Sequence, residues 1–164
     1  MTETAQLIDM LKRQLKAQGM TYRDVARALD VSETSVKRLF ASGRFTLERV
    51  VEISQLLGYT LADRNQRLPE AYALIEQALK LSPEDPFILD SMGWVLYRMN
   101  QNEAALTFLK RAHEIRSDAE ISAHYGEVLW VAGRQDEARK VWSGALKQSP
   151  ANELLLATVK KFSP

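Results

Sequence analysis

Few side chains in this sequence could perform chemistry, and they do not form a recognisable catalytic set. The two histidines, His113 and His124, lack an evident third metal ligand, so roles in the core or on the surface are favoured over metal binding. The chain has no cysteine, which excludes disulfides, thiolate metal sites and thiol catalysis. Acidic residues are scattered at solvent-facing helical spacing, and no glycine-rich phosphate loop is present. The sequence therefore predicts no enzyme, no cofactor and no metal site.

Length and composition allow one large domain or two small ones. The 164 residues are 46% apolar and 26% charged, the balance of an ordinary globular protein. The net charge is +1, and residues 1–58 carry nine Lys/Arg against seven Asp/Glu, which is compatible with DNA binding. The first residues lack the apolar core of a signal peptide, and no stretch approaches the ~18 apolar residues of a membrane span. The expected location is the cytoplasm, with no membrane partner.

The elements that position the polar side chains are all expected to be helices, because β-branched and polar residues never alternate for long. A first helix has one apolar stripe at spacings of three and four, made by Leu7, Ile8, Leu11 and Leu15. Gly19 ends this helix. Thr21 then begins a second helix as its N-cap, and Asp24 completes a near capping box.

The second and third helices are short and joined by a tight turn at residues 30–31. The buried face of the second helix consists of Val25, Ala26 and Leu29. Ser32 caps the third helix. The inward face of that helix consists of Val36, Leu39 and Phe40. A fourth helix opens at Phe45 or Thr46 with another apolar stripe. This arrangement predicts a small helical bundle in which a second helix crosses closely at Ala26.

The stretch MTYRDVARALDVSETSVKRLFASGRFTLERVVEISQLLG resembles the helix-turn-helix domain of Cro/C1-type (XRE-like) transcription regulators. The resemblance covers roughly residues 5–58, and several constrained positions agree together. One position departs from the family: Asp30 stands where the family usually has a glycine in a left-handed turn conformation. Aspartate tolerates that backbone region better than most residues do.

The resemblance implies that the third helix lies in the major groove of duplex DNA. Base edges would be contacted by Glu33, Thr34, Lys37 and Arg38. Phosphates would be contacted by Tyr22, Arg23, Ser32 and Arg44. The alternative is that these side chains are solvated charges on a helical scaffold. Because the segment is only slightly basic, we expect weak binding; the resemblance also implies a C2 homodimer formed through the N-terminal domain.

Small residues recur in the remaining hundred residues at a fixed period. Gly93 and Gly126 are 33 residues apart, and the same separation relates Ala105 to Ala138 and Ala112 to Ala145. This pattern resembles tetratricopeptide (TPR) repeats, in which small side chains let neighbouring helices approach closely. An earlier unit is found by counting back one period. Its small residues are Ala71 and Ala78, its closing residue is Pro83, and its glycine is Gly58, thirteen residues before Ala71.

Gly58 therefore belongs to both patterns, and no linker separates them. The sequence predicts an all-α fold in which a repressor-type helix-turn-helix bundle continues through a shared helix into a TPR α-solenoid. The expected boundaries are residues 1–58 for the first domain, 46–65 for the shared helix and 55–164 for about three repeats, with a capping helix at 152–162.

Three leucines of the shared helix, Leu56, Leu57 and Leu61, would have to serve both cores. Such an overlap favours an engineered chimera, made by superimposing the last helix of one domain on the first helix of another. The alternative is a natural fusion that acts as a DNA-binding transcription regulator with a TPR protein-binding domain.

The resemblance to TPR repeats also implies a concave groove lined by the first helix of each repeat. The positions expected to bind a peptide there are Tyr59, Phe87, Asp90, Trp94, Tyr97, Glu127 and Trp130, with Ala62, Glu120 and Ala123 beside them. The Lys/Asn clamp by which some relatives hold a C-terminal carboxylate is absent from these positions. The alternative is that Trp94, Trp130 and Trp142 pack the array or its capping helix.

Overall fold

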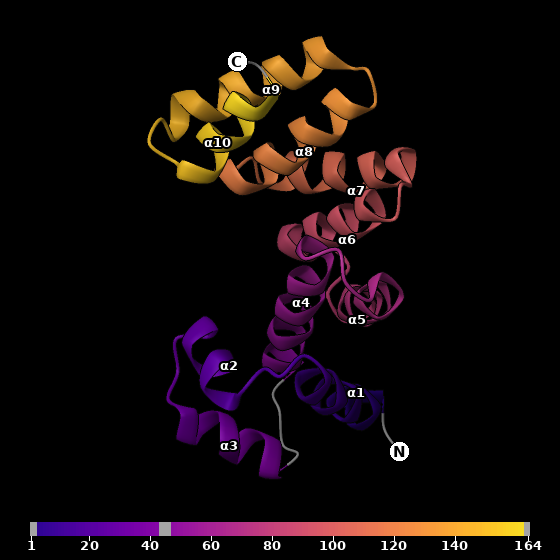
Figure 1. The fold of residues 1–164 in the computed structure, drawn as a ribbon, viewed down its shortest axis with the longest axis vertical. Helices are drawn as coiled ribbons and strands as arrows, with labels where there is room; N and C mark the ends of the chain where they lie inside the picture. Colours follow the sequence, from indigo (N-terminus) through magenta and orange to yellow (C-terminus); the bar gives the residue numbers. More distant parts are fainter. Residues whose placement is uncertain (1–2, 43–46, 163–164) are drawn as a thin grey trace. The chain divides into compact units, whose positions relative to one another are not determined.

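Every element of secondary structure in the described part of the chain is a helix, which confirms the predicted all-α class (Figure 1). The computed structural model describes residues 3–42 and 47–162. The helices are α1 (Glu3–Ala17), α2 (Tyr22–Ala28), α3 (Glu33–Ser42), α4 (Leu47–Asp63), α5 (Leu68–Leu81), α6 (Pro86–Arg98), α7 (Asn102–Ile115), α8 (Ala119–Val131), α9 (Gln135–Gln148) and α10 (Glu153–Phe162).

The chain divides into two compact units. Unit 1 spans Met1–Pro83 and contains α1 to α5, and unit 2 spans Glu84–Pro164 and contains α6 to α10. No helix in the described residues is long and apolar enough to cross a membrane.

The first helix of unit 1 forms as its apolar stripe predicts. Ile8, Leu11 and Leu15 are buried at 5%, 0% and 3% exposure. The helix ends at Ala17, and Gly19 adopts a left-handed φ of 63°, a conformation that costs glycine nothing. The amide of Met20 then donates to the carbonyl of Leu15 at 3.0 Å, closing the helix end.

The turns at both ends of α2 form as the sequence predicts. Thr21 caps α2 in a full capping box: its amide donates to Asp24 Oδ2 at 2.7 Å, and its hydroxyl accepts from the Asp24 amide at 3.3 Å. At the other end, Asp30 has a φ of 52°, the left-handed conformation expected at this position. The hydroxyl of Ser32 accepts from the Ser35 amide at 3.1 Å and so caps α3.

The fourth helix runs without a break through Gly58, as the overlap of the two patterns predicts. Along it, Ile53, Leu57 and Leu61 are almost fully buried, whereas Leu56 is half-buried. Helix α4 contacts both α1 and α5, so its apolar residues are shared between neighbours on two sides.

The chain leaves α4 at Asp63, slightly before the expected end of the shared helix. Asn65 and Arg67 have left-handed φ angles of 52° and 47°, which cannot continue a right-handed helix. The start of the expected range, at Thr46, lies outside the described residues.

Unit 2 contains two helical hairpins, α6–α7 and α8–α9, and α10 packs against α8 and α9. Glycines stand at both hairpin crossings. A Cβ at Gly93 would lie 2.9 Å from Cδ2 of Leu109 and 3.1 Å from the carbonyl oxygen of Ala105, and a Cβ at Gly126 would overlap the indole of Trp142. The 33-residue period therefore marks close helix crossings. Leu155 of α10 is fully buried, as expected of a capping helix.

Candidate functional site

The third helix of unit 1 has one buried face and one exposed polar face. Val36 and Phe40 are 0% and 2% exposed, and the Phe40 ring stacks on Tyr22 with centroids 5.1 Å apart. Thr34, Lys37 and Arg38 lie towards the outer side. This orientation follows from helical periodicity, because residues 36 and 40 are one turn apart. The outer side can therefore meet a large, flat or grooved partner.

A small ion-pair network lies at the start of this face. Nζ of Lys37 lies 2.7 Å from Glu33 Oε1, and Nε of Arg23 donates to Glu33 Oε2 at 3.2 Å. Lys37 first, and Arg23 second, lower the pKa of the Glu33 carboxyl. The carboxylate is therefore held ionised between two cations, and it neutralises charge that would otherwise face an anionic partner.

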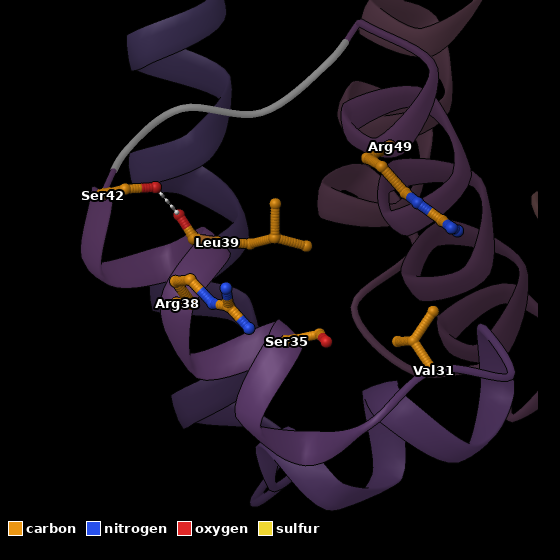
Figure 2. Close-up of a pocket in the computed structure, with 6 residues that line it drawn as sticks. All are labelled: Val31, Ser35, Arg38, Leu39, Ser42 and Arg49. Atoms are coloured by element: carbon orange, nitrogen blue, oxygen red, sulfur yellow. Dashed lines mark hydrogen bonds between the residues drawn. The ribbon is translucent and has the colours of Figure 1, made fainter.

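A surface pocket of about 470 Å³ lies beside this face. Figure 2 shows the residues that line it. Its lining residues are Val31, Ser35, Arg38, Leu39, Ser42 and Arg49. The prediction that Leu39 belongs to the inward face of α3 is wrong in part, because the side chain is half-buried and lines the pocket. Nη1 of Arg49 donates to Glu52 at 2.6 Å. Arg38 makes no hydrogen bond or ion pair with the described residues, so its guanidinium is available to a partner.

In unit 2, helices α6 and α8 are joined by a buried charged pair. Nδ1 of His124 lies 2.9 Å from Oδ2 and 3.1 Å from Oδ1 of Asp90, and the two residues are only 3% and 4% exposed. Burial disfavours the charged imidazole, but the Asp90 carboxylate more than offsets this and raises the pKa of His124. The pair therefore favours an imidazolium that donates to a carboxylate.

The same face carries a second set of contacts towards the C-terminal end of the helices. The Tyr97 hydroxyl donates to Glu127 Oε1 at 3.2 Å, and Lys161 of α10 donates to the same oxygen at 3.0 Å. Burial, with the Glu127 charge second, raises the pKa of Tyr97 to about 12. Trp94 stacks on His124 with ring centroids 4.2 Å apart. These side chains stabilise unit 2 from within.

Comparisons with known proteins agree with the two parts of this geometry. Residues 11–63 match the protein family described as Helix-turn-helix. The TPR repeat-containing protein PA4667 of Pseudomonas aeruginosa is 52% identical over 71 residues, which are 43% of this chain. The chain spans only 12% of the length of that relative.

Two solved structures share the fold. The structure of TTC0263, a thermophilic TPR protein in Thermus thermophilus, has a TM-score of 0.60 at 21% identity and covers 93% of this chain and 87% of that chain. MamA AMB-1 has a TM-score of 0.52 at 18% identity and covers 93% and 86%. The chain joins a helix-turn-helix segment to TPR-type repeats. Both resemblances predicted from the sequence are thereby confirmed.

Within the helix-turn-helix segment, the structure brings some predicted DNA-contact residues together and leaves others apart. Arg23, Glu33 and Lys37 form the ion-pair network, whereas Ser32 is occupied by capping α3. Tyr22 is half-buried against Phe40. Arg44 lies outside the described residues. No sequence pattern indicated the Arg23–Glu33 pair, since the two residues belong to different helices.

In the TPR-type unit, three predicted groove residues are buried rather than open. Asp90, Trp94 and Glu127 are 4%, 6% and 6% exposed, because each is engaged by neighbouring side chains. Their low exposure does not fit the expected role of accessible peptide contacts. Trp94 packs within the fold, as does Trp142 at 2% exposure, in line with the alternative expectation for the tryptophans.

Four other groove positions are more accessible, whereas Ala62 and Ala123 beside them are fully buried. Phe87, Tyr97 and Trp130 are half-buried, and so is Tyr59 in unit 1. The Arg116 guanidinium lies 5.2 Å from the centre of the Phe87 ring. Trp130 belongs to an aromatic cluster with Trp142 and Phe162, at centroid distances of 5.7 Å and 6.2 Å.

The second histidine has a different environment. His113 is half-buried, its ring lies 5.4 Å from that of Tyr125, and burial lowers its pKa. The described residues contain no group of three or more His, Asp or Glu side chains that could hold a metal ion.

Proposed function

We propose that this chain is a non-enzymatic protein whose helix-turn-helix segment contacts duplex DNA through α3 and whose TPR-type repeats bind other proteins. The observation that carries the DNA part is the orientation of α3. Val36 and Phe40 fix the helix in the core, and Lys37 and Arg38 project from other sides of it. A helix held in this way can enter the major groove of DNA, which is wide enough to admit it.

We expect the DNA affinity to be weak and its salt dependence to be modest. Glu33 already pairs with Lys37 and Arg23 and cancels one of their two positive charges, and Arg38 is the cation of α3 without an ion-pair partner in the described residues. Each phosphate neutralised by a protein cation releases counterions and steepens the dependence of affinity on salt. Few such contacts give shallow slopes and low affinity.

Fluorescence anisotropy with a labelled duplex of random sequence, titrated at several salt concentrations, tests this proposal. Arg38→Ala should weaken binding and, because Arg38 is predicted to contact a base edge, relax the sequence preference at one position of the duplex. Arg64→Ala is the matched control, because Arg64 is also exposed in unit 1 but lies after α4. Equal effects of the two substitutions would mean that α3 is not the contact surface.

We also propose that α4 is a shared helix between a first domain at 1–58 and a repeat domain at 55–164. Its contacts with both α1 and α5 support this, as does the close approach of α5 at Gly58. The arrangement is the one expected of an engineered fusion used chiefly as a building block. Tight, sequence-selective DNA binding at physiological salt would instead favour a natural transcription regulator.

Dimerisation through the N-terminal domain stays a prediction. Leu11, Ile53 and Leu57 are fully buried inside unit 1, so these apolar residues are not available to a dimer interface. Light scattering over a dilution series measures the mass directly. A dimeric mass at micromolar concentration supports a C2 homodimer, and a monomeric mass there rules it out.

A further inference from the structure

The pocket beside α3 is lined from the turn before α3, from α3 itself and from α4. Its lining residues are Val31 in the turn, Ser35, Arg38, Leu39 and Ser42 on α3, and Arg49 on α4. In Figure 2, Arg38 and Arg49 lie on opposite sides of the pocket, and the Leu39 side chain points from α3 towards α4. The pocket therefore brings two guanidinium groups and an apolar wall to one concave surface.

This space is open because α3 packs mainly against α2. The backbone of α3 approaches α2 closely and α4 far less, and the Phe40 ring of α3 stacks on Tyr22 of α2. Leu39 therefore does not join Val36 and Phe40 in the core and stays half-buried. The apolar pattern of α3 has one residue more than the core of unit 1 covers.

The apolar part of the pocket wall can hold the apolar part of a ligand. Val31 and Leu39 are both half-buried, so each keeps apolar surface in contact with water. Removing such surface from water is favourable. The volume of about 470 Å³ lies within the range of about 300–1,000 Å³ that is typical of small-molecule sites. The shape of the pocket therefore suits a small molecule with an apolar group.

The charge of the pocket is positive. Among the described residues that line it, Arg38 and Arg49 are cations and none is acidic. Glu52 offsets one of the two charges by accepting a hydrogen bond from Nη1 of Arg49 at 2.6 Å. Arg38 has no hydrogen bond or ion pair with any described residue. A guanidinium binds planar oxyanions through two parallel N–H donors, so the remaining charge selects an anion.

The two serines of the pocket are already engaged within the protein. Oγ of Ser35 lies 2.8 Å from Oγ of Ser32, and the hydroxyl of Ser42 donates to the carbonyl of Leu39 at 3.2 Å. An oxyanion in the pocket is therefore expected at Arg38 rather than at the serines.

We propose that this pocket binds a small organic anion, a carboxylate or a phosphate monoester that carries a short apolar group. The oxyanion pairs with Arg38, and the apolar group covers Leu39 and Val31. A phosphate of duplex DNA would also pair with Arg38, but it has no apolar part to cover Leu39. The free organic anion matches both halves of the pocket.

Occupation of the pocket also withdraws Arg38 from the surface offered to DNA. This second step rests on the proposed function, in which Arg38 is predicted to contact a base edge. The bound anion and the duplex then compete for one guanidinium. The organic anion would thus act as an effector that weakens DNA binding.

Nuclear magnetic resonance titration of the whole chain without DNA tests the anion site. The probes are phenylacetate and phenyl phosphate, with phenylacetamide as the neutral analogue and acetate as the anion that lacks an apolar group. The readout is the methyl signals of Val31 and Leu39, which Val31→Ile and Leu39→Met identify. We expect saturable shifts with the two aromatic anions, and binding of phenylacetamide and acetate weaker by about tenfold or more.

Arg38→Gln should weaken phenylacetate binding about three- to tenfold, because it removes the charge that holds the carboxylate. Arg13→Gln is the matched control, since Arg13 is an exposed arginine of α1, which does not line the pocket. Leu39→Ala should weaken phenylacetate more than acetate, because it removes only the apolar wall.

Three results would each overturn the anion site: no saturable shift with either aromatic anion, equal affinity for phenylacetamide and phenylacetate, or unchanged affinity in Arg38→Gln. A titration in which duplex DNA shifts the Val31 and Leu39 signals and no free anion does would also overturn it. The pocket would then belong to the DNA-contact surface.

The duplex titration by fluorescence anisotropy tests the second step. Saturating phenylacetate should weaken duplex binding of the unmodified chain to the level of Arg38→Ala and should not weaken Arg38→Ala further. Sodium acetate at the same concentration controls for ionic strength. An unchanged duplex affinity would overturn the effector role. A chain that binds no duplex at all would contradict the proposed function, while the titration without DNA still decides the anion site.

Discussion

Gly58 of α4 lies directly against Ile75 of α5. A Cβ at residue 58 would stand 2.9 Å from Cδ1 of Ile75 and 3.2 Å from the carbonyl oxygen of Ala71. Gly93 faces Leu109 and Ala105 in unit 2 in the same way. The second half of α4 and α5 therefore cross as closely as the helices of the downstream hairpin do.

We predict that Gly58→Ala destabilises unit 1. Alanine favours helix more than glycine does, by about 1 kcal/mol. Here, however, the added methyl overlaps Ile75 and crowds the backbone of α5, and overpacking of this kind costs about 1–3 kcal/mol. Hydrogen exchange of the α4 and α5 amides should show faster exchange in the variant.

Gly144→Ala is the matched control for this prediction. Gly144 lies within α9, is exposed, and has no neighbouring atom within 4 Å of its expected Cβ. The same substitution should stabilise the protein there by about 0.5–1 kcal/mol. If Gly58→Ala were stabilising to the same extent, the close contact with Ile75 would not exist.

Small residues at fixed spacing made this part of the fold predictable from the sequence. A glycine and an alanine twelve or thirteen residues apart mark one helix crossing, and the period repeats in Gly93 and Gly126. The helix-turn-helix was predictable for a similar reason, since the cap at Thr21 and the left-handed turn at Asp30 are local features.

The left-handed turn leads to a prediction of its own. Asp30 has a φ of 52° and makes no side-chain hydrogen bond in the described residues. Glycine has no Cβ penalty in this region, so Asp30→Gly should stabilise unit 1 by up to about 1 kcal/mol, while Asp30→Val should destabilise it by about 1 kcal/mol or more. Thermal unfolding by circular dichroism measures both; equal midpoints would show that the turn is not strained.

The polar contacts of the sites were not predictable in the same way. Asp90 and His124 are 34 positions apart, and Glu127 and Lys161 are also 34 apart. Periodicity assigns such residues to a helix face, but their pairing depends on how two helices align along their length. The sequence therefore placed Asp90 and Glu127 in a groove and could not show that they would be buried there.

The buried pair makes the stability of unit 2 depend on pH. The pKa of His124 is raised above its ordinary value of 6.5, so the native state holds a proton that the unfolded state releases. The protonated His124 contributes fully to the free energy of unfolding below about pH 6.5, and this contribution is lost as the pH rises through the pKa of His124 in the folded state. The charges facing His124 are those of Asp90, Glu120 and Glu127.

Urea unfolding followed by tryptophan fluorescence measures this effect, because all three tryptophans lie in unit 2. In Asp90→Asn, the free energy of unfolding should lose most of its decline above pH 6.5. His113 has the opposite pH dependence. Its pKa is lowered in the folded state, so its contribution to the free energy of unfolding is lost as the pH falls below 6.5. A stability that is flat from pH 6.5 upwards in the unmodified chain would contradict the charged pair.

The Glu33 network gives the sharpest test of how α3 meets DNA. Glu33 holds Lys37 at 2.7 Å and Arg23 at 3.2 Å. Glu33→Gln removes the carboxylate, so both cations become available to phosphates. We expect tighter binding to random duplex and a salt dependence steeper by about 0.9 for each cation recruited. Glu70→Gln is the control, since it removes the same charge from a pair with Arg67 after α4. Weaker binding in Glu33→Gln, confined to some sequences, would instead mean that Glu33 accepts a hydrogen bond from cytosine N4, as the resemblance to transcription regulators implies.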